Sequence, residues 1–267
     1  LNQFREGPIT SYTTLAGLEQ PITLGTLEDR NGVMWVGTFG GGLHRLREGM
    51  FETLPDPKGQ ISKRVMALHE GIDGALWLGT WGGGVNRILK GEITHLDTSA
   101  GLVHNKVRSL YQSSDGSVWI GTKGGLSRYA DGNFDTIGLE KGVALEDVYA
   151  IGESSSKQLW LGLLSGLKKY ENGVFKTPAG SEETKAIRAI HFGAKNNLWL
   201  ATSGQGLHFY DGQSTTAITS QHGLLDDVIY SVTEDAFDRF WMSSNRGIFW
   251  VSKKELQAFV KGEVTSV

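Results

Sequence analysis

The chain has 267 residues, a formal net charge of −3 at pH 7, 37 glycines, five prolines and no cysteine. Because the net charge is small and the basic residues are scattered, the sequence predicts no basic patch that would bind nucleic acid. The absence of cysteine excludes disulfides and thiolate metal sites. No apolar run approaches the roughly 20 residues that cross a bilayer, so we expect no direct membrane contact by this segment.

The first residues resemble the second half of a unit that recurs later. Residues 2–7, Asn-Gln-Phe-Arg-Glu-Gly, compare with residues 43–49, Leu-His-Arg-Leu-Arg-Glu-Gly, and a short β-prone stretch follows each. We therefore expect residues 1–14 to form the outer half of one repeat, and the chain to be an excised piece of a longer protein.

A tryptophan then returns every 39 to 42 residues, at Trp35, Trp77, Trp119, Trp160, Trp199 and Trp241. The neighbouring residues repeat as well, as in 76–80, Leu-Trp-Leu-Gly-Thr, and 118–122, Val-Trp-Ile-Gly-Thr. A period near forty in a β-rich sequence is typical of one four-stranded propeller blade. We expect each of these tryptophans to pack between neighbouring blades.

The third repeat shows the four expected strands, at 107–112, 118–122, 126–130 and 134–137. Turn residues separate them: Asp115-Gly116 lies between the first two strands and Asp131-Gly132 between the last two, as expected for hairpins. The final repeat is expected to have strands at 228–234, 240–244, 248–251 and near 263–267. A short helix is expected at 253–260, because Leu256, Phe259 and Val260 recur at helical spacing.

These elements predict an all-β fold in a single domain spanning residues 1–267. It is a β-propeller with six complete four-stranded blades plus the N-terminal half blade. We expect a seven-bladed ring, whose missing inner strands come from residues after Val267.

The repeat resembles the two-component regulator propeller family, in which Leu-Trp-Ile-Gly-Thr precedes Gly-Gly-Leu-x-Arg-Tyr and x-x-Gly-x-Phe. Residues 121–134 fit this pattern at nearly every position, and residues 101–107 are similar to its Gly-Leu-x-x-Asn-x-Val. The last repeat departs from it, with Trp241-Met242-Ser243-Ser244 in place of Trp-Ile-Gly-Thr. The Gly-His and Trp-Asp signature of WD40 repeats is missing.

The resemblance implies a role in signal transduction. Such propellers form the periplasmic or extracytoplasmic sensing part of bacterial membrane receptors, whose output part is a histidine kinase or a diguanylate cyclase. The expected partners are thus a small ligand and the remainder of the receptor chain. The family has no fixed ligand-binding residues that could be transferred to this chain.

Candidate site residues follow from propeller geometry, since ligands commonly bind at the face formed by the loops around the central channel. We expect a small polar ligand such as an oligosaccharide there, with Phe39 and Trp81 as apolar platforms. The expected ligand-binding set is Phe39, Trp81, His104, Asn105, Lys123, Glu146, Asp147, Gln205, Asp226, Asp227 and Arg246. The alternative is that these are ordinary solvated loop residues.

No catalytic residue, cofactor or metal site is expected in this segment. The seven histidines do not cluster at metal-ligand spacing, and neither His-Glu-x-x-His nor Gly-x-Ser-x-Gly occurs. Two alternatives to a sensor stay open. One is a propeller lyase or hydrolase that uses His104 or His222 with Glu146 or Asp227, and the other is a carbohydrate- or protein-binding scaffold.

Overall fold

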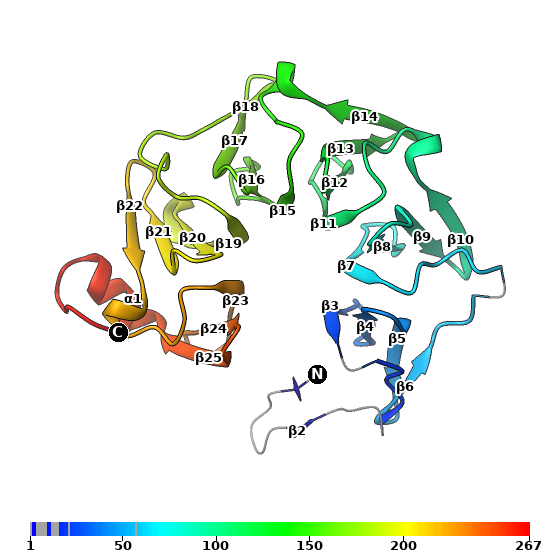
Figure 1. Ribbon diagram of the computed structural model, residues 1–267, viewed down its shortest axis with the longest axis horizontal. Helices are drawn as coiled ribbons and strands as arrows, with labels where there is room; N and C mark the ends of the chain where they lie inside the picture. Colours follow the sequence, from blue (N-terminus) through cyan, green and yellow to red (C-terminus); the bar gives the residue numbers. More distant parts are fainter. Residues whose placement is uncertain (1, 4–9, 12–15, 21, 57) are drawn as a thin grey trace. The chain divides into compact units, whose positions relative to one another are not determined.

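The computed structural model describes residues 2–3, 10–11, 16–20, 22–56 and 58–267. The chain divides into two compact units, residues 1–137 and 138–267. The described residues form six β-propeller blades, three in each unit (Figure 1). The prediction of an all-β propeller is therefore confirmed, whereas the seven-bladed ring and the single domain stay predictions.

The first unit holds three four-stranded antiparallel sheets whose neighbouring strands are consecutive in the chain. The first blade consists of β3 (Thr23–Glu28), β4 (Met34–Thr38), β5 (Gly42–Arg47) and β6 (Met50–Thr53). The second consists of β7 (Val65–Glu70), β8 (Leu76–Thr80), β9 (Val85–Leu89) and β10 (Glu92–Leu96). The third consists of β11 (Val107–Gln112), β12 (Val118–Thr122), β13 (Gly125–Ala130) and β14 (Asn133–Ile137).

The second unit holds two four-stranded sheets and one three-stranded sheet. The fourth blade consists of β15 (Val148–Glu153), β16 (Leu159–Leu163), β17 (Leu167–Glu171) and β18 (Val174–Lys176). The fifth consists of β19 (Ile187–Phe192), β20 (Leu198–Thr202), β21 (Leu207–Tyr210) and β22 (Thr215–Ile218). The sixth consists of β23 (Ile229–Glu234), β24 (Arg239–Ser244) and β25 (Gly247–Ser252), followed by α1 (Lys253–Val260).

The last blade corrects one prediction and confirms another. Helix α1 covers the expected residues, but residues 263–267 form no strand, so the sixth sheet lacks its fourth strand. Helix α1 and the turn after it contain the residues that would otherwise form a hairpin between β25 and a fourth strand. Val267 is tied back to the fold through a backbone hydrogen bond of 2.7 Å from its N–H to the carbonyl of His222.

The segment expected to form the N-terminal half blade contains two short strands. Strands β1 (Asn2–Gln3) and β2 (Thr10–Ser11) pair antiparallel in a two-stranded sheet. Residues 1, 4–9 and 12–14 of the predicted segment lie outside the described residues.

The hairpins between third and fourth strands follow from their residue pairs. Glu48-Gly49, Lys90-Gly91, Asp131-Gly132 and Asn172-Gly173 all have positive φ at both positions. Two successive positive φ angles define the type I′ turn, whose twist matches that of the flanking strands. Asp211-Gly212 differs, because a longer connection closed by Asp211 N–H to Ser214 O links β21 to β22.

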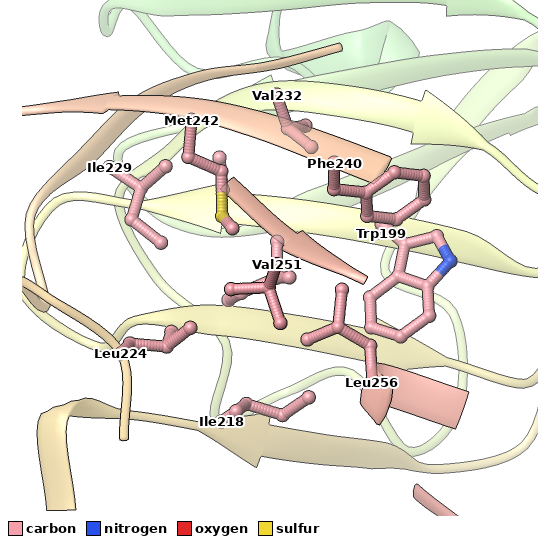
Figure 2. Close-up of a cluster of buried hydrophobic side chains, with 11 residues drawn as sticks. Trp199, Ile218, Leu224, Ile229, Val232, Phe240, Met242, Val251 and Leu256 are labelled. Carbon is pink, nitrogen blue, oxygen red and sulfur yellow. The ribbon is translucent and has the colours of Figure 1, made fainter. Parts of the chain in front are cut away.

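Trp77, Trp160 and Trp199 pack against the next blade, as predicted, whereas Trp241 contacts Trp250 of its own blade. The ring of Trp77 meets Tyr129 of the third blade edge-on at 5.6 Å, and Trp199 meets Phe240 of the sixth blade at 5.3 Å. Figure 2 shows Trp199 and Phe240 in one apolar cluster with Leu256 of α1 and Leu224. Burying these large rings between sheets stabilises the array of blades by roughly 2 to 3 kcal/mol per tryptophan.

Each first strand contains a β-bulge after its first residue. The pairing between first and second strands skips one residue at this point in each of the six described blades: Leu24, Met66, Arg108, Tyr149, Arg188 and Tyr230. Bulges redirect a side chain out of the regular alternation of the strand. The fold thus gives six equivalent positions, at the start of each first strand, whose residue types vary.

Candidate functional site

Two kinds of loop meet at the ends of the strands where these bulges lie. A leading loop runs into the first strand of a blade, and a joining loop connects its second and third strands. Gly82 and Gly84 of one joining loop both donate backbone hydrogen bonds of 3.0 Å to the carbonyl of Asn105 in the next leading loop. The backbone therefore links neighbouring blades at this face.

The same pattern recurs in both units. Gly40 and Gly42 donate to the carbonyl of Lys63, and Gly204 and Gly206 donate to that of Asp227. Gly40, Gly82 and Gly204 have φ between 108° and 124°, a conformation that favours glycine. The glycine-rich joining loops are thus part of a rigid scaffold that presents the side chains between them.

Several predicted site residues use their side chains within the scaffold. Asn105 Oδ1 accepts from Thr98 N–H at 2.9 Å, and the Asp227 carboxylate accepts from Ser220 N–H and Oγ–H at 2.6 and 2.9 Å. Glu146 accepts from Ser165 N–H and Oγ–H at 2.8 and 2.7 Å. These three side chains brace loops, and a ligand would have to displace the bonds that they make.

Further predicted residues take part in loop bonding too. Gln205 accepts from Lys185 N–H at 2.7 Å and donates to the carbonyl of Glu183. Asp226 accepts from Val228 N–H at 3.0 Å, and the Arg246 guanidinium donates to the carbonyl of Leu225 at 2.9 Å. Asp147 is half-buried, directly before β15.

Two positively charged side chains lie over the ring of Trp81. Lys106 Nζ is 4.9 Å and the guanidinium carbon of Arg108 is 4.3 Å from the centroid of its ring. Trp81 is also tied to Lys106 by a β-bridge, and its N–H donates to the carbonyl of Arg64 at 2.9 Å. The expected apolar platform is therefore half-buried and shared with two positively charged side chains.

Phe39 has a similar arrangement in the first blade. Its ring is 36% exposed, and the guanidinium carbon of Arg64 lies 5.1 Å from the ring centroid. Lys123, the equivalent residue of the third blade, is exposed, and its N–H donates to the carbonyl of Lys106. His104 Nδ1 accepts from Lys106 N–H at 2.9 Å. The structure thus brings Trp81, His104 and Lys123 together around Lys106.

The bulged residues are candidates that the sequence analysis missed. In the second unit Arg188 lies 3.9 Å over the ring of Tyr149, and Tyr230 donates to Asn245 Oδ1 at 2.6 Å. A signal was present in the sequence, because five of these six residues follow the β-branched apolar residue that begins the first strand, and their types range from leucine to arginine. A position whose residue type varies within an otherwise regular repeat indicates a role apart from packing.

Two buried histidines clamp leading loops to third strands. His208 Nε2 donates to the carbonyl of Gln205, and its Nδ1 bonds with Thr184 Oγ1, both at 3.1 Å. His44 Nε2 accepts from Glu19 N–H at 3.4 Å. Burial lowers the pKa of both imidazoles, although the carboxylate of Glu19 partly opposes this at His44. Both rings are thus held neutral for a structural purpose.

Cavities in the described part of the chain also lie elsewhere, and three of them are at the ends of the blades where the first and second strands turn. One of about 380 Å³ is lined by Ser154, Trp160 and Tyr210, one of about 450 Å³ by Trp199, Phe209 and Val260, and one of about 280 Å³ by Trp35 and Leu76. Each adjoins a recurring tryptophan between two blades of one unit. Because the groove recurs with the repeat, we attribute it to blade packing.

Neither a metal centre nor a membrane span is found in the described part of the chain. No group of three or more histidine, aspartate or glutamate side chains there could hold a metal ion. No helix among those residues is long and apolar enough to cross a bilayer.

Comparison with known proteins bears on the repeat and the fold. Residues 17–40 and 101–124 match the family described as two component regulator propeller. The comparison with curated proteins found no match. These two segments are therefore similar to two-component regulator propeller repeats.

Solved structures resemble the chain at low sequence identity. The extracellular domain of BT4673 from B. thetaiotaomicron, described as part of a one-component or a hybrid two-component system, matches with a TM-score of 0.73 and 22% identity over 85% of this chain and 32% of its own. That of BT3049, described as a hybrid two-component system of the same organism, matches with a TM-score of 0.58 and 23% identity over 90% of this chain and 40% of its own.

An enzyme shares the fold as well. A virginiamycin B lyase from Staphylococcus aureus matches with a TM-score of 0.69 and 17% identity over 92% of this chain and 84% of its own. At these identities the matches show a propeller fold and no more. The chain spans only 32% and 40% of the length of the two extracellular domains that it matches.

Proposed function

We propose that this chain, two segments of which are similar to two-component regulator propeller repeats, is a ligand-sensing part of the extracytoplasmic portion of a bacterial membrane receptor. It binds a small polar ligand, such as an oligosaccharide, at the face formed by the leading and joining loops. The output domain, a histidine kinase or a diguanylate cyclase, belongs to the rest of the receptor. The segment itself is not catalytic.

The observation that carries this proposal is the resemblance to extracellular domains of two-component systems, together with the matched repeats. The loop face supports it physically. Its backbone is braced across neighbouring blades, and it presents aromatic and charged side chains from several blades. Such preorganisation lowers the entropic cost of binding a ligand.

Binding without conversion separates a sensor from a propeller lyase or hydrolase. The structure ties Glu146 and Asp227, the acid–base candidates of that alternative, into loop bracing through two hydrogen bonds each. Carboxylates that already accept these bonds are poorly placed to move protons on a ligand. This observation favours the sensor.

The test is calorimetric titration of the chain with a panel of neutral, carboxylated and sulfated oligosaccharides, followed by mass spectrometry of the recovered ligand. We expect saturable binding and unchanged ligand mass. Trp81→Ala should weaken binding at least tenfold, a loss of about 1.4 kcal/mol. Trp250→Ala is the matched control, because Trp250 is 49% exposed on the outer strand of the last blade. Conversion of the ligand would identify an enzyme, and equal affinities of the two variants would exclude the loop face around Trp81.

A further inference from the structure

The loop face of the first unit is cationic. Arg64, Lys106 and Lys123 come from two successive leading loops and a joining loop, and contacts around Trp81 join them. The carbonyl of Arg64 accepts from Trp81 N–H, Trp81 is bridged to Lys106, and the carbonyl of Lys106 accepts from Lys123 N–H. We call these three residues the cationic cluster.

The charges of the cationic cluster are not neutralised by neighbouring carboxylates. Among the residues that the structure describes, none of the three forms an ion pair. The segments 38–42, 61–64, 80–84, 103–108 and 122–125, which form this part of the face, contain no aspartate or glutamate. Like charges held together without counter-charges raise the electrostatic potential above them.

The carboxylates of Glu19 and Asp97 adjoin these loops, and both are engaged elsewhere. Glu19 lies beside Gly41 and accepts from Thr53 Oγ1 at 3.0 Å. Asp97 lies beside Gly84, accepts from Ser99 N–H and Oγ–H, and is 3.6 Å from His95 Nε2. These contacts hold the two acids within their own blades.

The equivalent loops of the second unit have the opposite balance. Leading segments 144–149, 183–188 and 225–230 carry Glu146, Asp147, Glu183, Asp226 and Asp227 against Lys185 and Arg188, and the joining loops add Arg246. The repeat itself therefore does not require basic residues at these positions. The cationic cluster is a property of particular blades, as expected for a recognition surface grafted onto a common scaffold.

Trp81 restricts the position of one side chain of the cationic cluster. Lys106 Nζ lies 4.9 Å from the ring centroid, within the range of a cation–π interaction. A lysine held in this way loses less rotamer freedom when it binds an anion than a lysine that is free in solvent. The aromatic residue singled out as a stacking platform also positions a positive charge.

We propose that the ligand of this face is an anionic oligosaccharide, whose sulfate or carboxylate groups pair with Arg64, Lys106 and Lys123 while its sugar rings contact Phe39 and Trp81. The inference rests on the proposed function and specifies its ligand class. Arg64 can bind a sulfate or carboxylate with two parallel hydrogen bonds, and the two lysines act as point charges.

The experiment compares one sulfated oligosaccharide with its chemically desulfated counterpart, at 50 and 300 mM salt. We expect the sulfated form to bind at least about tenfold more tightly at low salt, and the difference to shrink at high salt, because ions screen exposed charges. The double variant Lys106→Gln, Lys123→Gln should lose this preference. Lys90→Gln, at an exposed lysine in the turn between β9 and β10, is the matched control and should keep it.

The outcomes separate the two proposals. Equal affinity for the sulfated and desulfated forms would overturn the anionic ligand and leave the sensor standing. Equally tight binding of single-stranded DNA would reduce the cluster to a general polyanion surface, which also overturns it. Thermal melting of every variant verifies folding. Substitution of the exposed Lys90 and Lys123 is expected to leave the melting temperature unchanged, and melting of the double variant also reports the loss of the contact between the half-buried Lys106 and Trp81.

Discussion

The guanidinium carbon of Arg188 lies 3.9 Å from the centre of the Tyr149 ring, although the two residues belong to successive blades. Both occupy the bulge of their first strand. One guanidinium nitrogen reaches Ser203 Oγ at 3.4 Å, whereas Nε is buried without a hydrogen-bond partner. A buried donor without an acceptor costs about 1 to 3 kcal/mol. The arginine is thus held at the loop face at a cost in stability.

Arg188→Met tests this interpretation. The substitution removes a cation–π contact worth about 0.5 to 2 kcal/mol and relieves a buried donor of comparable cost, while the apolar stem is kept. We expect the free energy of unfolding to change by less than about 1 kcal/mol, measured by urea titration. A loss above about 2 kcal/mol would show that the arginine is retained for stability.

The blade register predicts unequal effects for two residues four positions apart. Trp119 is 5% exposed and lies in β12, so Trp119→Ala should cost about 3 to 5 kcal/mol. Lys123 is exposed in the next joining loop, and Lys123→Ala should cost less than about 0.5 kcal/mol. Thermal unfolding of both variants measures the difference, and equal melting shifts would contradict the register.

Acidification should destabilise the fold through its buried histidines. Burial lowers the pKa of His208 below its ordinary value of 6.5, so the unfolded chain takes up a proton at higher pH than the folded chain does. The stability from neutral His208 is thus present above about pH 6.5 and is lost as the pH falls below it. Unfolding free energies at pH 7.5 and 5.5 should show this loss, and His208→Gln should reduce it. An unchanged pH dependence in the variant would assign the loss to other groups.

Close approach of the backbone explains one glycine in the fifth blade. Gly206 has a φ of +74°, and a Cβ there would lie 2.2 Å from the carbonyl oxygen of Ile218. Gly212 also has positive φ, but a Cβ there would meet nothing within 4 Å. Gly212→Ala should therefore cost about 1 kcal/mol for its backbone conformation, and Gly206→Ala clearly more. Urea unfolding compares them, and similar costs would mean that the loop yields easily.

Short-range patterns were sufficient for the fold. The period of the tryptophans, the residue pairs such as Asp131-Gly132 and the helical spacing of Leu256, Phe259 and Val260 each act within one repeat, so they can be interpreted one repeat at a time. The missing fourth strand of the last blade lay beyond such patterns. Whether residues 263–267 join the sixth sheet depends on where the end of α1 positions them relative to β25.

The loop face shows the same limit for individual residues. Sequence alone identified Trp81, Asn105 and Asp227 as polar or aromatic residues of loops. It did not distinguish residues that contact a ligand from residues that only contact solvent. The role of Trp81 depends on a neighbour more than about 20 residues away, because Arg108 lies over its ring. The roles of Asn105 and Asp227 depend on local turns that only the folded loop forms, in which they accept hydrogen bonds from Thr98 and Ser220.

The sequence by itself determined the blades, their order and their recurring tryptophans, because a repeat of about forty residues carries its strands, turns and core positions locally. Only the tertiary structure decided which loop residues brace the scaffold and which face outward. Bulged first strands and interlocked glycine loops bring side chains of successive blades together, and no local pattern specifies these pairings. For that reason the cationic cluster around Trp81 emerges only once neighbouring blades are packed.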